Sequence, residues 1–124
     1  MAVVLVVDDE AVVRKPLRDV IEAAGYQVVE AANGRVDPRV LGRIDAAVVD
    51  IFMPDRDGLE LISDLRRGYP HVKIVAITGL FRYGEVDALE VARRMGAHAT
   101  LEKPFDMKQL LAALESLLTL GAGS

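Results

Sequence analysis

The sequence predicts a doubly wound α/β fold, in which a five-stranded parallel sheet of order 2-1-3-4-5 forms a three-layer sandwich with helices. Short runs rich in Val and Ile alternate with longer segments of helical period, which is typical of parallel βαβ units. Three of these runs, AVVLVV, AAVVDIF and VKIVAI, are almost continuously apolar, as expected of strands covered on both faces. The chain has 124 residues, 52% of them hydrophobic, which suffices for one domain with its own core.

The strands are expected at residues 2–7, 27–31, 46–50, 72–78 and 97–101. Segment 27–31 is the most polar of the five, which favours a place at the edge of the sheet. The order 2-1-3-4-5 is common for such a chain with right-handed crossovers, and it sets strands one and three side by side. Sheets of this kind bind ligands beyond the carboxyl ends of these central strands.

The first helix is predicted from apolar residues three and four positions apart. It is expected to bury Val13, Leu17 and Ile21 and to end at Gly25. Pro16 lies inside this pattern and cannot donate a helical hydrogen bond, so the helix either begins after residue 11 or is kinked. The following segment NGRVDPRVLGRID contains two Gly and one Pro, which predicts only irregular turns before the third strand.

Caps and helix breakers define the later connections. The third helix is expected to open at DGLE, with Asp57 as its cap, and to end at Gly68. The segment GLFRYGEVD predicts a long loop after the fourth strand. Residues 1–120 are expected to form the domain and residues 121–124 a disordered tail. Asp106 is expected to cap the last helix, which carries an apolar stripe of Met107, Leu110, Leu111, Leu114, Leu117 and Leu118.

Composition excludes several classes of protein. The chain has no cysteine, which excludes disulfides, thiolate metal sites and a cysteine nucleophile, and fits a reducing compartment. No stretch approaches the roughly eighteen apolar residues of a membrane span, and the first apolar run lacks the features of a signal peptide. A net charge of −4 argues against direct nucleic-acid binding. We therefore expect a soluble, cytoplasmic protein without a membrane or nucleic-acid partner.

Five polar side chains lie at or just after the carboxyl ends of four predicted strands. Asp8 and Asp9 follow the first strand, Asp50 ends the third, Thr78 ends the fourth and Lys103 follows the fifth. Because the strands are parallel, these ends share one edge of the sheet. The five side chains are expected to converge there.

Two explanations account for the acids. Asp8 and Asp9 could cap the first helix. Capping leaves Asp50 unexplained, because two unit charges about 4 Å apart repel by roughly 4 kcal/mol at an effective dielectric near 20. A divalent cation would offset that repulsion, and a set of oxygen ligands suits Mg²⁺. His71 and His98 are isolated in the sequence and are expected at the surface or at a strand edge, not as metal ligands.

These residues resemble the receiver domain of two-component response regulators, which has a flavodoxin-like fold. The resemblance covers nearly the whole chain and rests on VVDDE, VVDIFMPDRDGLEL, IVAITG and GAHATLEKPF, in this order and at strand ends. It implies that Asp50 is the phosphoacceptor. It also implies that Asp8 and Asp9 hold Mg²⁺ together with Asp50, and that the backbone carbonyl of Phe52 is a further ligand.

The resemblance assigns roles to two more strand ends and to the partners. Thr78 would donate a hydrogen bond to a phosphoryl oxygen, Lys103 would pair with another, and the bond from Lys103 to Pro104 would be cis. The phosphoryl group would come from a phosphohistidine on a histidine kinase or a histidine phosphotransfer protein. The domain would catalyse its own phosphorylation and dephosphorylation, as a signalling domain and not as an enzyme. It would bind a downstream effector through its fourth helix, fifth strand and fifth helix.

Alternatives from other classes remain open. A pseudo-receiver would share the fold and bind proteins without being phosphorylated. An aspartyl-phosphate phosphatase of the haloacid-dehalogenase type would also attack with Asp50, but it places a second Asp where this sequence has Phe52. A flavodoxin-like nucleotide binder is disfavoured, because acids after the first strand would repel a phosphate group.

The largest departure from the family pattern is at Thr100. Thr100 stands where receivers usually have a Tyr or Phe that moves when the residue at Thr78 binds the phosphoryl group. Phe81 and Tyr83, in the extended loop, are the candidates to replace that aromatic. Whether the receiver stands alone or belongs to a longer regulator or hybrid kinase stays open.

Overall fold

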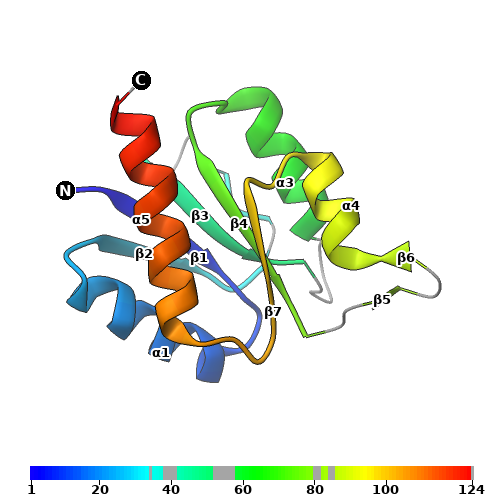
Figure 1. Cartoon of the computed structure of the whole chain (residues 1–124), viewed down its shortest axis with the longest axis horizontal. Helices are drawn as coiled ribbons and strands as arrows, with labels where there is room; N and C mark the ends of the chain where they lie inside the picture. The colour runs from blue at the N-terminus through cyan, green and yellow to red at the C-terminus, as the bar shows by residue number, and fades with distance from the viewer. Residues whose placement is uncertain (34, 38–41, 52–57, 80–81, 84–85, 124) are drawn as a thin grey trace.

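The computed structural model describes the chain except for residues 34, 38–41, 52–57, 80–81, 84–85 and 124 (Figure 1). Residues 82–83, 86 and 120–123 are described by their backbone alone. No helix in the described part of the chain has the length and apolar character needed to cross a lipid bilayer.

Five parallel strands form the sheet, in the order β2-β1-β3-β4-β7 (Figure 1). This is the predicted order 2-1-3-4-5, so the predicted fold class is confirmed. The predicted bounds of β2 and β3 are also confirmed, whereas β1 and β4 begin one residue later than predicted, and β7 is shifted toward the C-terminus. The strands are β1 Val3–Val7, β2 Gln27–Ala31, β3 Ala46–Asp50, β4 Lys73–Thr78 and β7 Ala99–Glu102.

Helices cover both faces of the sheet. Helices α1 and α5 lie on one face, which we call the α1/α5 face, and α3 and α4 lie on the other, the α3/α4 face (Figure 1). Within residues 32–45 the described positions form no helix, so the labels pass from α1 to α3. The helices are α1 Ala11–Ala23, α3 Gly58–Gly68, α4 Ala88–Met95 and α5 Met107–Gly123.

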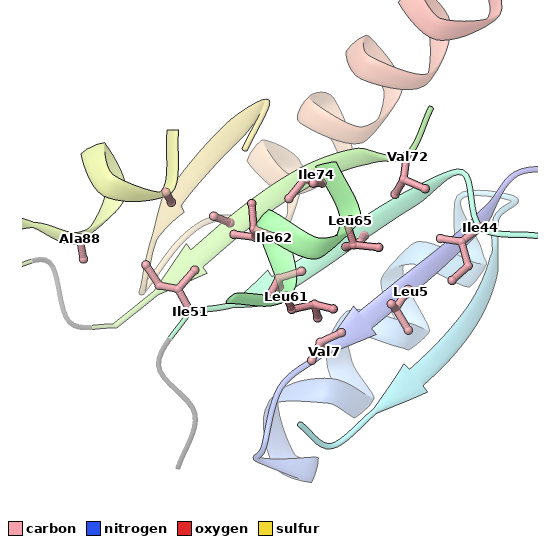
Figure 2. Close-up of a cluster of buried hydrophobic side chains, with 14 residues drawn as sticks. Leu5, Val7, Ile44, Ile51, Leu61, Ile62, Leu65, Val72, Ile74 and Ala88 are labelled. Atoms are coloured by element: carbon pink, nitrogen blue, oxygen red, sulfur yellow. The ribbon is translucent and has the colours of Figure 1, made fainter. Parts of the chain in front are cut away.

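The core has two halves because successive side chains of a strand point to opposite faces. In β1, Val4 and Val6 pack on the α1/α5 face, and Leu5 and Val7 pack on the α3/α4 face. Strands β3 and β4 alternate in the same way, which explains their continuous apolar sequences. Figure 2 shows the α3/α4 half, where Leu61, Ile62 and Leu65 of α3 lie over the sheet residues Leu5, Val7 and Ile74.

Helix α1 tolerates Pro16 within its span. The helix begins at Ala11, so the alternative in which it starts after residue 11 is wrong. The amide that Pro16 lacks would have bonded to the carbonyl of Val12. Both residues are exposed, and Val12 is 77% exposed, so water can serve that carbonyl. Gly25 follows the helix with φ 100°, as expected of a glycine at a helix end.

Helix α5 begins at the predicted cap. The amide of Lys108 donates to Asp106 Oδ1 at 2.9 Å, and the amide of Asp106 donates to Gln109 Oε1 at 3.0 Å, which is a reciprocal capping arrangement. Leu110 and Leu114 of the predicted stripe are fully buried. The helix continues to Gly123, into the segment predicted to be a disordered tail. The domain boundary at residue 120 stays a prediction.

The connection between β4 and α4 contains two features that the sequence did not specify. The predicted long loop contains two short antiparallel strands, β5 Arg82–Tyr83 and β6 Val86–Asp87. Asp87 then caps α4, because its Oδ1 accepts the amides of Leu89 and Glu90 at 3.0 and 3.3 Å. The predicted cap of α3, Asp57, lies outside the described residues.

His98 lies just before β7, at the amino ends of the strands. Its Nδ1 accepts the amide of Ile74 at 3.0 Å, and its own amide donates to the carbonyl of Ile74 at 2.8 Å. Burial lowers the pKa of His98, and the positive charges of Arg66 and Lys73 lower it further. The strand-edge role expected for this histidine is therefore the observed one, and the neutral imidazole is the form that fits.

Candidate functional site

The alternation of the strands brings three charged residues to one face of the sheet. Asp8, Asp50 and Lys103 each occupy the next alternate position after residues that pack on the α1/α5 face. Asp8 follows the end of β1, Asp50 is the last residue of β3, and Lys103 follows β7. The preceding residues on this face are Val4, Val6, Ala46, Val48, Ala99 and Leu101.

Lys103 bridges the two buried acids. Its Nζ lies 3.2 Å from Asp8 Oδ2 and 3.2 Å from Asp50 Oδ2. Asp8 is fully buried and Asp50 is 4% exposed. Burial alone would lower the pKa of Lys103, but the charges of Asp50 and Asp8, and hydrogen bonds to both, raise it above its usual value. The ammonium therefore stays charged and offsets the repulsion between the two carboxylates.

Asp8 does not act as the cap of α1. The cap position belongs to Glu10, whose side chain makes no capping hydrogen bond. Asp8 Oδ1 instead accepts the amide of Glu10 at 2.9 Å, and the amide of Asp8 donates to the carbonyl of Ala31 in β2 at 3.2 Å. Helix capping therefore does not account for the position of Asp8.

The three consecutive acids Asp8, Asp9 and Glu10 form a cluster in which the ligand oxygens lie within 4.8 Å of one another. Asp8 is buried, whereas Asp9 and Glu10 are exposed. Such a cluster offers one buried carboxylate ligand and two that are exposed to solvent. It suits Mg²⁺, which takes a few carboxylate oxygens and keeps several of its waters. The residues present thus fit that ion. The predicted carbonyl ligand, Phe52, lies outside the described residues.

The remaining predicted residues lie at the same edge. Thr78 ends β4 and is fully buried, and its carbonyl accepts the amide of Lys103 at 2.7 Å. The peptide bond from Lys103 to Pro104 is cis, as predicted. Gly58 opens α3 so close to the end of β3 that an added Cβ would lie against the carbonyl of Asp50 and 2.7 Å from the Cα of Ile51.

Residues 4–115 match the family model described as the response regulator receiver domain. The chain belongs to this family. As a receiver it is 35% identical over 115 residues to the transcriptional regulatory protein PdtaR of Mycobacterium tuberculosis, covering 90% of this chain and 54% of PdtaR. It therefore spans about half the length of that relative.

Two further comparisons cover almost all of both chains. The receiver is 30% identical to the sporulation initiation phosphotransferase F of Bacillus subtilis, over 94% of each chain. Its structure is similar to that of the response regulator protein TrrA from Thermotoga maritima in complex with Mg²⁺-BeF, with a TM-score of 0.82 and 28% identity, covering 94% of this chain and 99% of TrrA.

Of the candidate switch residues of this receiver, Thr100 contacts helix α4. Thr100 Oγ1 accepts a hydrogen bond from Arg93 Nη2 at 3.0 Å, which joins β7 to α4. Tyr83 belongs to β5, where only its backbone is described, and Phe81 lies outside the described residues. The assignment of a replacement aromatic stays a prediction.

A hollow borders the receiver's site on the α1 side. Its volume is about 430 Å³, and its lining is mainly apolar. Val12, which is 77% exposed, forms part of its wall, and Lys103 joins it to the acids. The lining residues are Val12, Val13, Pro16, Leu17, Lys103, Pro104, Phe105 and Met107.

Sequence reasoning missed three residues of the site. Glu10 could have been included, because it extends a run of consecutive acids. Gly58 stands in the predicted opening of the third helix, DGLE, but its close approach to Asp50 depends on how α3 meets β3. Arg14 contacts the backbone carbonyl of Asp8, and no sequence pattern specifies a contact of that kind.

Proposed function

We propose that this receiver takes a phosphoryl group from a phosphohistidine onto Asp50, with Mg²⁺, and thereby changes its binding to a partner. The observation that carries the proposal is the bridge from Lys103 to Asp8 and Asp50 at 3.2 Å. A buried carboxylate at a strand end, beside a second acid and a lysine held by both, has the groups that phosphoryl transfer requires.

The proposed transfer forms a bond between a carboxylate oxygen of Asp50 and phosphorus. The bond from phosphorus to the donor imidazole nitrogen breaks, and that nitrogen keeps the electron pair and gains a proton. Asp50 is suited to the attack because burial at the end of β3 removes water from around its carboxylate. Asp8, Asp9 and Asp50 would hold Mg²⁺, which supplies positive charge to the phosphoryl oxygens when it is bound.

Lys103 would stabilise the charge that develops on the phosphoryl group. Its ammonium donates a hydrogen bond to the Asp50 carboxylate, and we propose that it donates to a phosphoryl oxygen after the transfer. Thr78 would donate its hydroxyl proton in a hydrogen bond to another phosphoryl oxygen. The hydrogen bond from the Lys103 amide to the Thr78 carbonyl supports this assignment, because it fixes the two residues relative to each other.

The proposed donor is a histidine kinase or a histidine phosphotransfer protein. The apolar hollow beside Lys103 supports this part of the proposal, since a partner that reaches Asp50 would also cover exposed Val12. The effector would bind α4, β7 and α5, where Arg93 and Thr100 join two of the three elements. The domain would act as a signalling phosphoacceptor that catalyses its own modification.

The experiment is phosphorylation by a small phosphodonor such as acetyl phosphate, followed by intact mass spectrometry. Wild type should gain one phosphoryl group in Mg²⁺ and none in excess EDTA. Asp50→Asn should gain none, and Asp19→Asn, which alters an exposed acid of α1, should behave as wild type. No gain in wild type would favour the pseudo-receiver. Steady release of phosphate from many phosphodonor molecules without a lasting gain would favour a phosphatase.

A further inference from the structure

Arg14 of α1 contacts the backbone between the two acids at the end of β1. Its Nη1 donates to the carbonyl oxygen of Asp8 at 2.6 Å, and its Nε lies 3.3 Å from Glu30 Oε1 in β2. The Arg14 side chain is only 16% exposed. Helix α1 packs against β1 and β2 (Figure 1). The two contacts place the guanidinium between the end of β1 and β2.

The carbonyl of Asp8 lies outside the hydrogen bonds of the helix. The first carbonyl used by α1 is that of Glu10, which accepts the amides of Val13 and Arg14, both at 3.0 Å. Asp8 is fully buried, and a buried carbonyl without a partner would destabilise the turn. Arg14 therefore supplies a charge-assisted hydrogen bond to a carbonyl for which the described part of the backbone shows no donor.

This contact fixes the orientation of the peptide that joins Asp8 to Asp9. The peptide unit is planar, so holding the Asp8 carbonyl also sets the direction of the Asp9 amide and of the chain toward Asp9. The preceding peptide is fixed separately, by the hydrogen bond from the Asp8 amide to Ala31. The relative position of the two carboxyl-bearing residues thus depends on Arg14.

We infer that Arg14 is a positioning residue for the cation site, holding Asp8 and Asp9 in the geometry that binds Mg²⁺. The inference rests on the proposed function. Glu30 holds the guanidinium from the side of β2 and remains ionised, because hydrogen bonds from Arg18 and Arg14 lower its pKa despite some burial. Arg14 is thus held between β2 and the turn.

Charge and geometry predict opposite effects of Arg14 on Mg²⁺ affinity. A positive charge near a cation site opposes binding, so removal of the charge alone would tighten binding. Loss of a contact that orients a metal ligand weakens binding, commonly by tenfold or more. The sign of the change therefore separates the two roles.

Arg18 is a matched control on the same helix. It bonds to the same Glu30, with Nη1 2.7 Å from Oε2, and its Nε lies 3.0 Å from Glu22 Oε1. Its described hydrogen bonds do not include Asp8. Substitution of Arg18 thus removes an equal charge and a shorter hydrogen bond to Glu30, and leaves the peptide between the acids in place.

The test is Mg²⁺ titration of wild type, Arg14→Met, Arg14→Lys, Arg18→Met and Arg18→Lys by isothermal calorimetry at constant ionic strength. We expect Arg14→Met to bind Mg²⁺ about tenfold more weakly or worse. Arg14→Lys should also bind Mg²⁺ more weakly than wild type, since one ammonium cannot reproduce the two contacts that the guanidinium makes. Both Arg18 variants should bind as tightly as wild type or slightly more tightly. Circular dichroism verifies that each variant is folded at the titration temperature.

Three results would overturn the inference. Tighter binding by Arg14→Met would show that the residue acts through its charge alone, and unchanged binding would show that it does not orient the metal ligands. Equal weakening by the Arg14 and Arg18 variants would assign the effect to the network around Glu30. If Arg14→Met does not fold, wild-type affinity in Arg14→Lys overturns it. A wild type that binds no Mg²⁺ would instead remove the proposed function, and this inference with it.

Discussion

Replacement of Lys103 by Met should destabilise the metal-free protein by about 3 kcal/mol. At an effective dielectric near 20, an ammonium 3.2 Å from a carboxylate is attracted by about 5 kcal/mol, and Lys103 has two such partners. The cost of burying the lysine offsets much of this attraction. Removal of one member of a buried ion pair costs about 3–5 kcal/mol, because the remaining charges lose their partner. We take the lower end, since the Lys103 side chain is 23% exposed.

The assay is urea unfolding followed by far-ultraviolet circular dichroism, in EDTA and in saturating Mg²⁺. Mg²⁺ should stabilise both proteins by linkage, by about 2.7 kcal/mol at a concentration one hundred times Kd. The gain should be larger for Lys103→Met, because the ion restores positive charge between the acids. Lys15→Met is the control, since Lys15 belongs to an exposed pair of α1 that contributes at most about 0.5 kcal/mol.

The reasoning would be refuted if Lys103→Met unfolded at the same urea concentration as Lys15→Met. It would also be refuted if Mg²⁺ stabilised wild type and Lys103→Met equally. Either result would mean that Asp8 and Asp50 do not depend on Lys103 for charge compensation.

Three further predictions test other parts of the structure. The pKa of His98 is lowered in the folded state, so its contribution to stability is present above its unfolded pKa of 6.5 and is lost as the pH falls through the folded pKa. His98→Gln should therefore flatten the pH dependence of the unfolding free energy below neutrality, and an unchanged slope would contradict this. Gly58→Ala should destabilise by about 1–3 kcal/mol in urea unfolding, because its Cβ meets backbone, whereas Gly68→Ala, with nothing within 4 Å, should not; equal midpoints would contradict the close approach. If the extended loop is the switch, beryllium fluoride should change hydrogen exchange in residues 79–87; protection that changes only around Asp50 would exclude it.

The strands could be predicted because burial on both faces leaves a direct trace in the sequence. The runs at β1, β3 and β4 are apolar at consecutive positions, and the structure divides those positions between two cores. Helix α1 was harder to predict. A proline inside a helix removes one backbone hydrogen bond. Here the carbonyl that loses its donor belongs to exposed Val12, and exposure at that position depends on tertiary packing. The hairpin of β5 and β6 has two-residue strands, too short to show a period.

The site divides in the same way. Asp8, Asp50 and Lys103 could be predicted to converge, because parallel strands share one edge and their side chains alternate. The bridge at Lys103 confirms that convergence. Arg14 could not be predicted, since its partner is a carbonyl oxygen that every residue possesses. Thr100 could be identified as unusual, but its bond to Arg93 depends on the rotation of α4 over β7.

The most direct test of the central claim is the location of the phosphoryl group within the chain. After phosphorylation in Mg²⁺, reduction with borohydride converts an aspartyl phosphate to homoserine, and fragmentation of the tryptic peptide of residues 44–56 separates its three aspartates, Asp45, Asp50 and Asp55. We predict homoserine at residue 50 alone, dependent on both phosphodonor and Mg²⁺. Homoserine at Asp45, at Asp55 or in another peptide, with residue 50 unmodified, would contradict the assignment of Asp50 as the phosphoacceptor.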